Sequence, residues 1–150
     1  MIDHFTLTVS NIKRSKTFYV KALAPLGYAI RMDFGELAGF GDAKKPYFWL
    51  KQGDGQPPMH IAFQAKNRAA VDAFHAAAIR AGAKDDGKPG LREHYHPDYY
   101  GAFVVDPDGH PIEAVCHLAE GKAARKATHT PAKRTPKQAV RKPAKRVTRK

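Results

Sequence analysis

The amino-acid sequence predicts an α+β fold built from two similar units, each with the order strand, helix and three strands. Two short segments, 3–9 and 59–65, alternate apolar and polar residues as half-buried strands do. Each is followed by an amphipathic helical pattern that ends near a glycine. Matching positions in the two units lie 56 residues apart, as His4 and His60 do. Such a fixed period indicates an internal duplication.

The first unit opens with a strand over residues 2–9. Ser10 or Asn11 is expected to cap a helix that runs to about Leu23, and Gly27 follows the helical segment. The three return strands are then expected in the ranges 28–34, 37–41 and 47–52.

The second unit begins with the strand 59–65, followed by a helix from Asn67 to about Ala81. Strands are expected at 100–105 and 112–117, joined by the turn sequence Asp-Pro-Asp-Gly. The remaining strand has no clear place in the irregular stretch 83–99.

The positive charge of the chain is concentrated at its C-terminal end. The net charge is +12, of which residues 119–150 carry +11 and residues 1–118 only +1. The tail is rich in Lys, Arg, Ala, Pro and Thr, and it is too poor in bulky apolar residues to offset the entropy of ordering. We therefore expect a folded domain over 1–118 and a disordered basic tail over 119–150. The tail suits non-specific nucleic-acid binding, and the alternative is a solubilising extension without a dedicated partner.

The remaining composition points to a reducing, non-membrane setting. The single cysteine, Cys116, excludes an intrachain disulfide framework. No secretory signal pattern is visible at the N-terminus, and no stretch approaches the ~20 apolar residues of a membrane helix. A cytoplasmic location is expected.

Three residues form a candidate metal site. His4 and His60 occupy equivalent polar positions in the two opening strands, and Glu113 lies in the middle of the last, otherwise apolar strand. A buried carboxylate is costly unless it is paired or binds a cation. Two histidines and one carboxylate are a set that binds divalent ions and leaves positions open for substrate oxygens. The alternative is an edge strand with Glu113 in solvent and two structural histidines.

With these features the sequence resembles the vicinal oxygen chelate superfamily, which includes glyoxalases, bleomycin and fosfomycin resistance proteins and extradiol dioxygenases. The resemblance covers about 1–118. It is carried by the segments Ile2-Asp3-His4, Met59-His60-Ile61-Ala62-Phe63 and Asp106-Pro107-Asp108-Gly109-His110-Pro111-Ile112-Glu113.

The resemblance implies two βαβββ modules whose curved sheets form a cup around a divalent metal ion, which would be Fe, Mn, Zn or Ni. His4, His60 and Glu113 match the superfamily's ligand positions. Aligning Pro46 with Pro111 places Phe48 opposite Glu113, where glyoxalase I members resemble each other in having a carboxylate as the fourth protein ligand. Phe48 cannot bind a metal ion, which argues against the glyoxalase I arrangement. By the same strand parity, Trp49 is expected in the core.

The segment 94–100, His-Tyr-His-Pro-Asp-Tyr-Tyr, is a second candidate for function. We expect it at the rim of the pocket, with His96 and Tyr100 as catalytic candidates for acid–base work and aromatic stacking. A separate metal pair formed by His94 and His96, or a loop without function, are the alternatives.

Three functions are compatible with these features. The first is a metal-dependent enzyme of lyase, thiol transferase or dioxygenase type that acts on a small oxygenated molecule. The second is a protein of the bleomycin-resistance type that sequesters a ligand without turnover, and the third is a passive module whose tail binds nucleic acid. The sequence names neither the substrate nor the metal ion. It also leaves open whether the site forms within one chain or across a homodimer.

Overall fold

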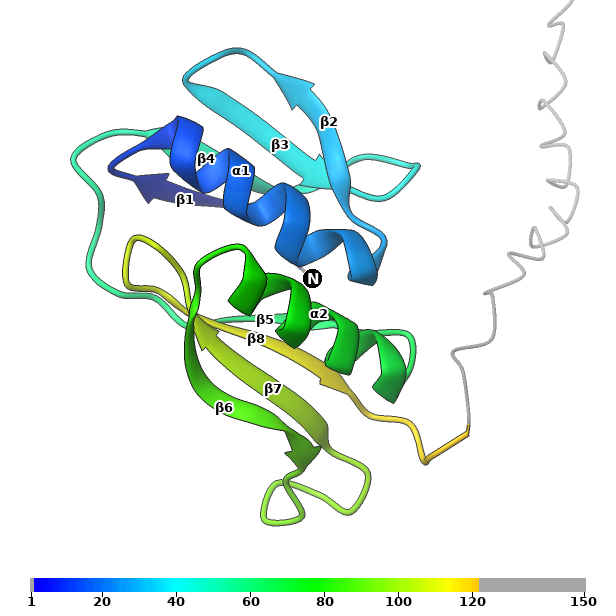
Figure 1. The fold of residues 1–150 in the computed structure, drawn as a ribbon. Helices are drawn as coiled ribbons and strands as arrows, with labels where there is room; N and C mark the ends of the chain where they lie inside the picture. The colour runs from blue at the N-terminus through cyan, green and yellow to red at the C-terminus, as the bar shows by residue number, and fades with distance from the viewer. Residues whose placement is uncertain (1, 122–150) are drawn as a thin grey trace, which may run out of the picture.

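The computed structural model describes residues 2–121 of the chain. The first module contains β1 (Phe5–Val9), α1 (Ile12–Leu23), a short 3-10 helix η1 (Ala24–Leu26), β2 (Ala29–Asp33), β3 (Leu37–Gly41) and β4 (Pro46–Gln52). The second contains β5 (Ile61–Gln64), α2 (Arg68–Arg80), β6 (Lys84–Leu91), β7 (Tyr100–Val105) and β8 (Pro111–Cys116) (Figure 1). The predicted α+β fold of two βαβββ modules is confirmed.

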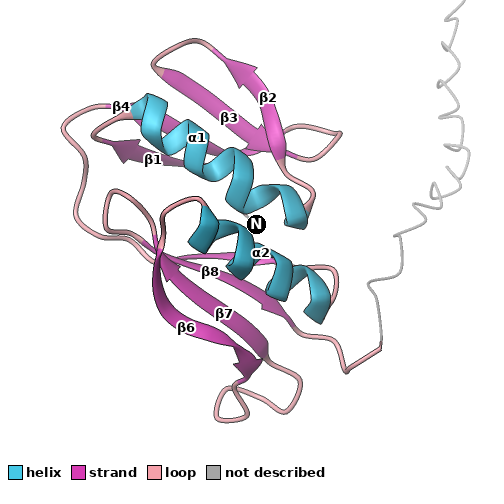
Figure 2. Ribbon diagram, viewed as in Figure 1, coloured by secondary structure: helices cyan, strands magenta, loops and turns pink. Residues whose placement is uncertain are grey.

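Each module forms its own four-stranded sheet, and the two strand orders are the same. The orders are β1-β4-β3-β2 and β5-β8-β7-β6, with the first and last strands of each module paired in parallel. α1 and α2 cover one face of their sheets and lie side by side between the modules (Figure 2). The other face of each sheet carries no element of the described chain, and we call it the open face.

Asparagines cap both helices: Asn11, one of the two residues expected at the first helix, and Asn67, as expected at the second. The side chain of Asn11 accepts a hydrogen bond from the backbone N–H of Arg14, and Asn67 does the same for Ala70. These bonds satisfy one of the free N–H groups of each first turn. Gly82, which follows the Ala81 cap of the second helix, has a φ of 100°, which a residue with a side chain adopts only with strain.

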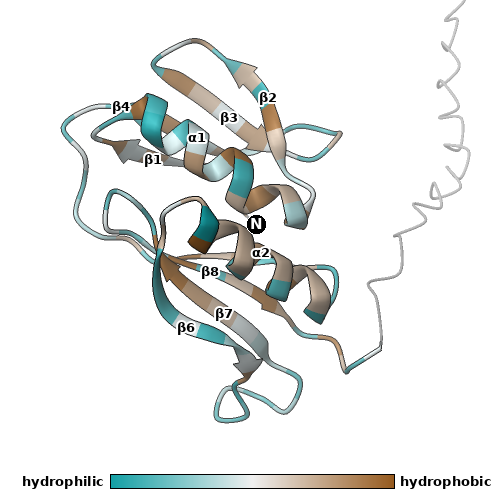
Figure 3. Cartoon of the chain, viewed as in Figure 1, coloured by the Kyte–Doolittle hydropathy of each residue, from teal (hydrophilic) through white to brown (hydrophobic). Residues whose placement is uncertain are grey.

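One hydrophobic core is shared by the two modules. The faces of the strands that point toward the helices supply most of it, and the ring of Phe48 in β4 lies 5.4 Å from that of Phe63 in β5. Figure 3 shows apolar residues along much of β3 and β7, whereas β6 is hydrophilic. β6 is an edge strand with the sequence Lys-Asp-Asp-Gly-Lys-Pro-Gly-Leu and two register shifts against β7. Because apolar and polar residues do not alternate in β6, the alternation pattern of the sequence does not reveal this strand.

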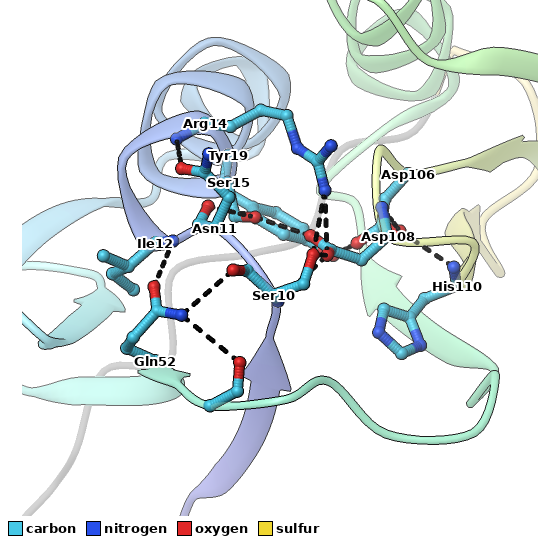
Figure 4. Close-up of polar contacts among 11 residues, drawn as sticks. Ser10, Asn11, Ile12, Arg14, Ser15, Tyr19, Gln52, Asp106, Asp108 and His110 are labelled. Carbon is cyan, nitrogen blue, oxygen red and sulfur yellow. Dashed lines mark hydrogen bonds and ion pairs between the residues drawn. The ribbon is translucent and has the colours of Figure 1, made fainter.

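The turn before β8 ties the second module to the start of α1 (Figure 4). One oxygen of Asp108 accepts hydrogen bonds from the backbone N–H of Ser10 at 3.0 Å, its hydroxyl at 2.5 Å and the Arg14 guanidinium at 2.9 Å. The other oxygen accepts from the Ser15 hydroxyl at 2.7 Å. Only 4% of the Asp108 side chain is exposed. Burial opposes ionisation, but these donors hold the pKa of Asp108 below its usual value.

A second contact of the same turn is buried more deeply. The Tyr19 hydroxyl of α1 donates a hydrogen bond of 2.6 Å to Asp106. Burial, assisted by the nearby Asp106 charge, raises the pKa of Tyr19 well above its usual value, so this hydroxyl remains a donor.

The predicted tail falls almost entirely outside the described residues, which end at 121. The boundary at residue 118 lies just after β8 and remains a prediction. Within 2–121, neither helix is long and apolar enough to cross a membrane.

Candidate functional site

Glu113 is the centre of the site. It lies in the middle of β8, and only 3% of its side chain is exposed. Its neighbours Ile112 and Ala114 point to the helix side and belong to the core, so Glu113 points to the open face. One carboxylate oxygen, Oε2, lies 3.0 Å from Nε2 of His60, and the other, Oε1, accepts a hydrogen bond of 2.5 Å from the Tyr99 hydroxyl.

His60 reaches Glu113 because β5 and β8 are paired in parallel. Ala62 lies opposite Glu113 in this ladder, and His60, two residues earlier, lies on the same face of the sheet. Its side chain is 53% exposed, whereas that of Glu113 is buried. The pair therefore combines a buried carboxylate with an imidazole that is open to solvent.

Tyr99 fixes the orientation of the carboxylate. Burial, together with the hydrogen bond to Glu113 and its negative charge, raises the pKa of Tyr99, so the phenol remains a hydrogen-bond donor. Gly101 leaves room for this contact. A Cβ atom at that position would lie 3.1 Å from Oε1 of Glu113 and 3.2 Å from the Tyr99 ring. Oε1 is thus occupied by Tyr99, and Oε2 faces His60.

A pair of imidazoles packs behind Tyr99. The backbone N–H of Asp98 donates to Nδ1 of His96, which leaves the ring proton of a neutral His96 on Nε2. His96 Nε2 lies 2.8 Å from Nδ1 of His117 and donates to it in this tautomer. His117 then carries its own proton on Nε2. The ring centres of His96 and His117 lie 5.4 and 5.1 Å from that of Tyr99.

The sequence-predicted catalytic pair is only partly brought to the site. His96 lies in the cluster next to Glu113 and contacts it through Tyr99. Tyr100 points to the opposite side of the sheet, where its hydroxyl donates to Asp72 of α2 at 2.8 Å. The preceding residue, Tyr99, occupies the place expected for Tyr100. Because successive strand residues point to opposite faces, an error of one residue changes the face.

His4 lies on the open face of the first module, apart from the other two predicted ligands. Its side chain is 59% exposed, and Nδ1 lies 3.0 Å from the carboxylate of Asp3. With Thr6, Leu37 and Trp49 it lines a shallow cavity of about 210 Å³. Among residues 2–121, no three His, Cys, Asp or Glu side chains are close enough to hold one metal ion. Within the described part of a single chain, His60 and Glu113 thus lie together, and His4 lies apart from them.

Comparisons with known proteins agree with this architecture. A family model of the Glyoxalase/Bleomycin resistance protein/Dioxygenase superfamily matches residues 1–114. The chain belongs to this superfamily. A glyoxalase/bleomycin resistance protein from Albidiferax ferrireducens T118 is 28% identical, with a TM-score of 0.64, over 76% of this chain and 96% of that chain.

Other similar structures share the superfamily fold at lower identity. A possible glyoxalase from Bacillus cereus is 24% identical, with a TM-score of 0.59, over 77% of this chain and 98% of that one. A superfamily enzyme from Burkholderia phytofirmans PsJN is 18% identical, with a TM-score of 0.61, over 78% and 98%. At these identities the likeness shows the fold alone. No curated protein matches the chain.

The duplicated module of the superfamily allows the two halves to be compared by strand register. In the second half, Ala62 of β5 lies opposite Glu113 of β8. The corresponding residue of β1 is Thr6, 56 positions earlier, and it lies opposite Trp49 of β4. Trp49 is therefore the counterpart of Glu113, and the alignment that placed Phe48 there is wrong. Trp49 lies half-buried on the open face, not in the core as expected.

A β-bulge explains the shift. Gly41 of β3 pairs with Pro46 of β4, and Phe40 pairs with Phe48, so Tyr47 is an extra residue between the two pairs. An alignment of β4 with β8 that starts from Pro46 and Pro111 is therefore one residue out of register after the bulge. The absence of a carboxylate at this position still holds, because tryptophan cannot bind the metal ion either.

The two clustered ligand candidates fit a divalent ion. Adjacent ligands of an octahedral ion with bonds of about 2.1 Å lie about 3.0 Å apart. His60 Nε2 and Glu113 Oε2 have this separation, and the partial exposure of His60 leaves the approach open.

Several further residues at the site have little signal in the sequence. Tyr99 and His117 reach it from a loop and from just beyond the last strand. Phe103 lies opposite Glu113 in the β7–β8 ladder. The alternation of β7, once its register against Glu113 is known, is the signal that would have found Tyr99 and Phe103.

Proposed function

We propose that the protein is a metal-dependent enzyme of the glyoxalase/dioxygenase superfamily that acts on a small oxygenated molecule. The observation that carries this proposal is the 3.0 Å contact between Nε2 of His60 and Oε2 of the buried Glu113. A carboxylate held in a largely apolar strand is costly, and a bound cation offsets that cost. The resemblance to the superfamily also favours a metal-binding role for this pair.

The residues around the pair would prepare it for this role. Tyr99 occupies one oxygen of Glu113, so the carboxylate offers a single oxygen to an ion. The Asp98 N–H donates to His96, and His96 in turn donates to Nδ1 of His117, so a neutral His117 carries its proton on Nε2. That proton would be available to a substrate oxygen. When bound, a divalent Fe, Mn, Zn or Ni ion would supply Lewis-acid polarisation of two neighbouring substrate oxygens.

We propose that the third ligand, His4, comes from a second copy of the chain. His4 lies on an open face that carries no other described element, and the His60–Glu113 pair lies on the other module's open face. A homodimer in which unlike open faces meet would complete two identical sites. This arrangement follows the equivalence of His4 and His60 in the duplicated modules.

Metal content of the purified full-length protein tests the ligand pair. Glu113→Gln keeps the size of the side chain and removes its charge. We expect this variant and the separate variant His60→Ala each to lose the metal ion. Asp85→Asn is the matched control, because His75 also lies 3.0 Å from a carboxylate oxygen of Asp85, which is 42% exposed. The proposal fails if wild type, reconstituted with each of the four ions, binds none more tightly than Glu113→Gln does.

A mixing experiment tests the shared site. His4→Ala and Glu113→Gln each remove a ligand from every site, so neither variant alone should hold metal. Unfolding and refolding the two variants together at equal amounts should give about half heterodimers, each with one intact site. We expect recovery of about a quarter of the wild-type metal content. No recovery on mixing would refute a site that is shared between two copies of the chain.

A second candidate function is ligand sequestration without turnover. A cavity of about 460 Å³ opens between the modules beside His60. Aromatic residues dominate its walls, namely Phe5, Tyr28, Tyr47, Phe48 and Phe63. Such a lining suits a flat apolar ligand. Stoichiometric binding of an aromatic compound that persists in EDTA, without product formation, would favour this function over the enzyme.

For the basic tail we propose weak, non-specific binding of nucleic acid. The support is its charge of +11 over residues 119–150, with no aromatic residue for base stacking. The full chain should bind duplex DNA with an affinity that falls steeply between 50 and 200 mM salt, on the order of 10³-fold for about six phosphate contacts. A 1–121 chain should not bind. Salt-independent binding, or equal binding by the shorter chain, would exclude this role.

A further inference from the structure

An arginine and a phenylalanine form a stacked pair on the open face of the second module. Arg92 follows β6, and its guanidinium carbon lies 5.4 Å from the centre of the Phe103 ring of β7. This is a cation–π distance. The pair belongs to the open face because Phe103 lies directly opposite Glu113 in the β7–β8 ladder.

The stacked pair adjoins the proposed metal ligands. The ring centres of Phe103 and His60 lie 6.4 Å apart. Together with the 5.4 Å stacking distance, this places the Arg92 guanidinium within about 12 Å of the His60 ring. A molecule of the size of a small aromatic acid can reach both groups.

Two glycines of β6 leave the space in which the pair lies. A Cβ atom at Gly87 would lie 3.0 Å from the Phe103 ring, and one at Gly90 would lie 2.9 Å from Nη1 of Arg92. β6 shifts register against β7 next to both glycines. An ordinary side chain at either position would displace the ring or the guanidinium.

The guanidinium is also held in place by the backbone. Nη2 of Arg92 donates to the carbonyl of Lys88 at 2.8 Å, and Nη1 donates to the carbonyl of Leu91 at 3.2 Å. A guanidinium has five N–H donors, so about three remain for another partner. The side chain is half-buried and fixed in orientation before any ligand binds.

The charge of Arg92 has no carboxylate partner among residues 2–121. Arg14 and Arg68, by contrast, form ion pairs with Asp108 and Asp98. A fixed, unpaired guanidinium next to an open, aromatic surface is suited to bind an oxyanion through two parallel N–H groups.

We propose that Arg92 binds the anionic group of the substrate. The inference rests on the proposed function, because one end of the substrate would carry two neighbouring oxygens toward His60 and Glu113. The other end would carry a carboxylate or phosphoryl group toward Arg92. Phe103 lies between the two ends and supplies a flat apolar surface. The substrate class is thus a small acid, and a neutral analogue of the same shape binds more weakly.

Three probes of one shape test the charge requirement. 3,4-Dihydroxybenzoate, 3,4-dihydroxybenzamide and 3,4-dihydroxyphenylphosphonate share the ring and its neighbouring oxygens and differ only in the opposite group. Binding is measured by NMR titration of the full chain in EDTA, following the amide signals of Gly87, Gly90 and Phe103. The metal-free protein is used so that loss of the metal function and loss of anion binding give separate results.

We expect wild type to bind the benzoate at least about tenfold more tightly than the benzamide, because a charge-assisted bidentate contact distinguishes them. Arg92→Met should remove this preference, and Arg92→Lys should keep part of it. Arg80→Met, an exposed arginine at the end of α2, is the control and should leave it unchanged. Melting curves of all variants verify that they fold.

The relative affinities of the two anions assign the anionic group. Tighter binding of the phosphonate would assign a phosphoryl compound, and tighter binding of the benzoate a carboxylic acid. Equal binding of acid and amide by wild type would overturn the proposal. So would a preference that persists in Arg92→Met, which would place anion binding elsewhere, for example on the basic tail.

Discussion

Replacing Asp108 with Asn tests how the two modules are joined. The substitution keeps the shape of the side chain and removes the charge that faces Ser10, Arg14 and Ser15. The Asn amide group also presents N–H donors where Asp108 has an oxygen, so at least one of the four present donors loses its acceptor. This contact joins the β8 turn to the start of α1, so its loss affects both modules.

The expected cost follows from the geometry. Hydrogen bonds to a charged group contribute about 1.5–3 kcal/mol each, and losses within one cluster are not additive. Since Asp108 is 4% exposed and some bonds survive in Asn, we expect a loss of about 3 kcal/mol in the free energy of unfolding. For about 120 ordered residues the unfolding entropy is about 0.25 kcal/mol/K, which gives a fall in Tm of about 12 °C.

The assay is thermal unfolding of wild type and Asp108→Asn at a series of pH values. The folded-state pKa of Asp108 is lowered from 3.8, so its contribution is present at neutral pH and is lost as pH falls through that lower value. Low pH protonates the wild-type carboxyl and makes it resemble the variant. The Tm difference should be constant near pH 7 and should shrink only below about pH 4.

Asp33→Asn is the matched control. Both oxygens of Asp33 lie 3.0 Å from the Lys16 ammonium, but the pair lies at the surface, and its removal should leave Tm nearly unchanged. A fall in Tm for Asp108→Asn no larger than that of the control would refute the assignment of this turn as the connection between the modules. A Tm difference that does not shrink at all as the pH falls below about 4 would refute the role of the charge.

Three further predictions concern the site and the tail. Trp49→Glu should tighten metal binding by adding a carboxylate at the counterpart of Glu113, whereas Trp49→Gln should not, as measured by metal titration. Gly101→Ala should weaken metal binding and lower stability by about 1–2 kcal/mol, because its Cβ crowds Oε1 of Glu113; calorimetry of both quantities tests this. A 1–121 chain should melt within a few degrees of the full chain, since the tail has almost no bulky apolar residue, and a large loss would show that it packs on the domain.

Most of the fold could be predicted because its signals are local. The alternating strands, the asparagine caps and the glycine stops all depend on neighbouring residues, and the duplication repeats them. β6 lacked such a signal. It is a polar edge strand whose residues need not alternate, and its pairing with β7 depends on long-range contacts.

The candidate site could be predicted only where strand parity was certain. His60 and Glu113 lie within clear strands, and the structure brings them together. Tyr100 was named as a catalytic candidate, but its side chain lies on the helix side, because the irregular loop before β7 hides the parity of the strand. Phe48 was aligned with Glu113 because a bulge at Tyr47 inserts one residue, which no local pattern reveals.

The divergence of the two modules gives a physical argument for the proposed shared site. If both halves had kept the carboxylate, each open face would carry a histidine and a glutamate. Instead, one face presents Glu113 with His60, and the other presents Trp49 with His4. Joining like faces would give either two carboxylates or none, whereas a twofold dimer that joins unlike faces gives two equal sites, each with two histidines and one carboxylate.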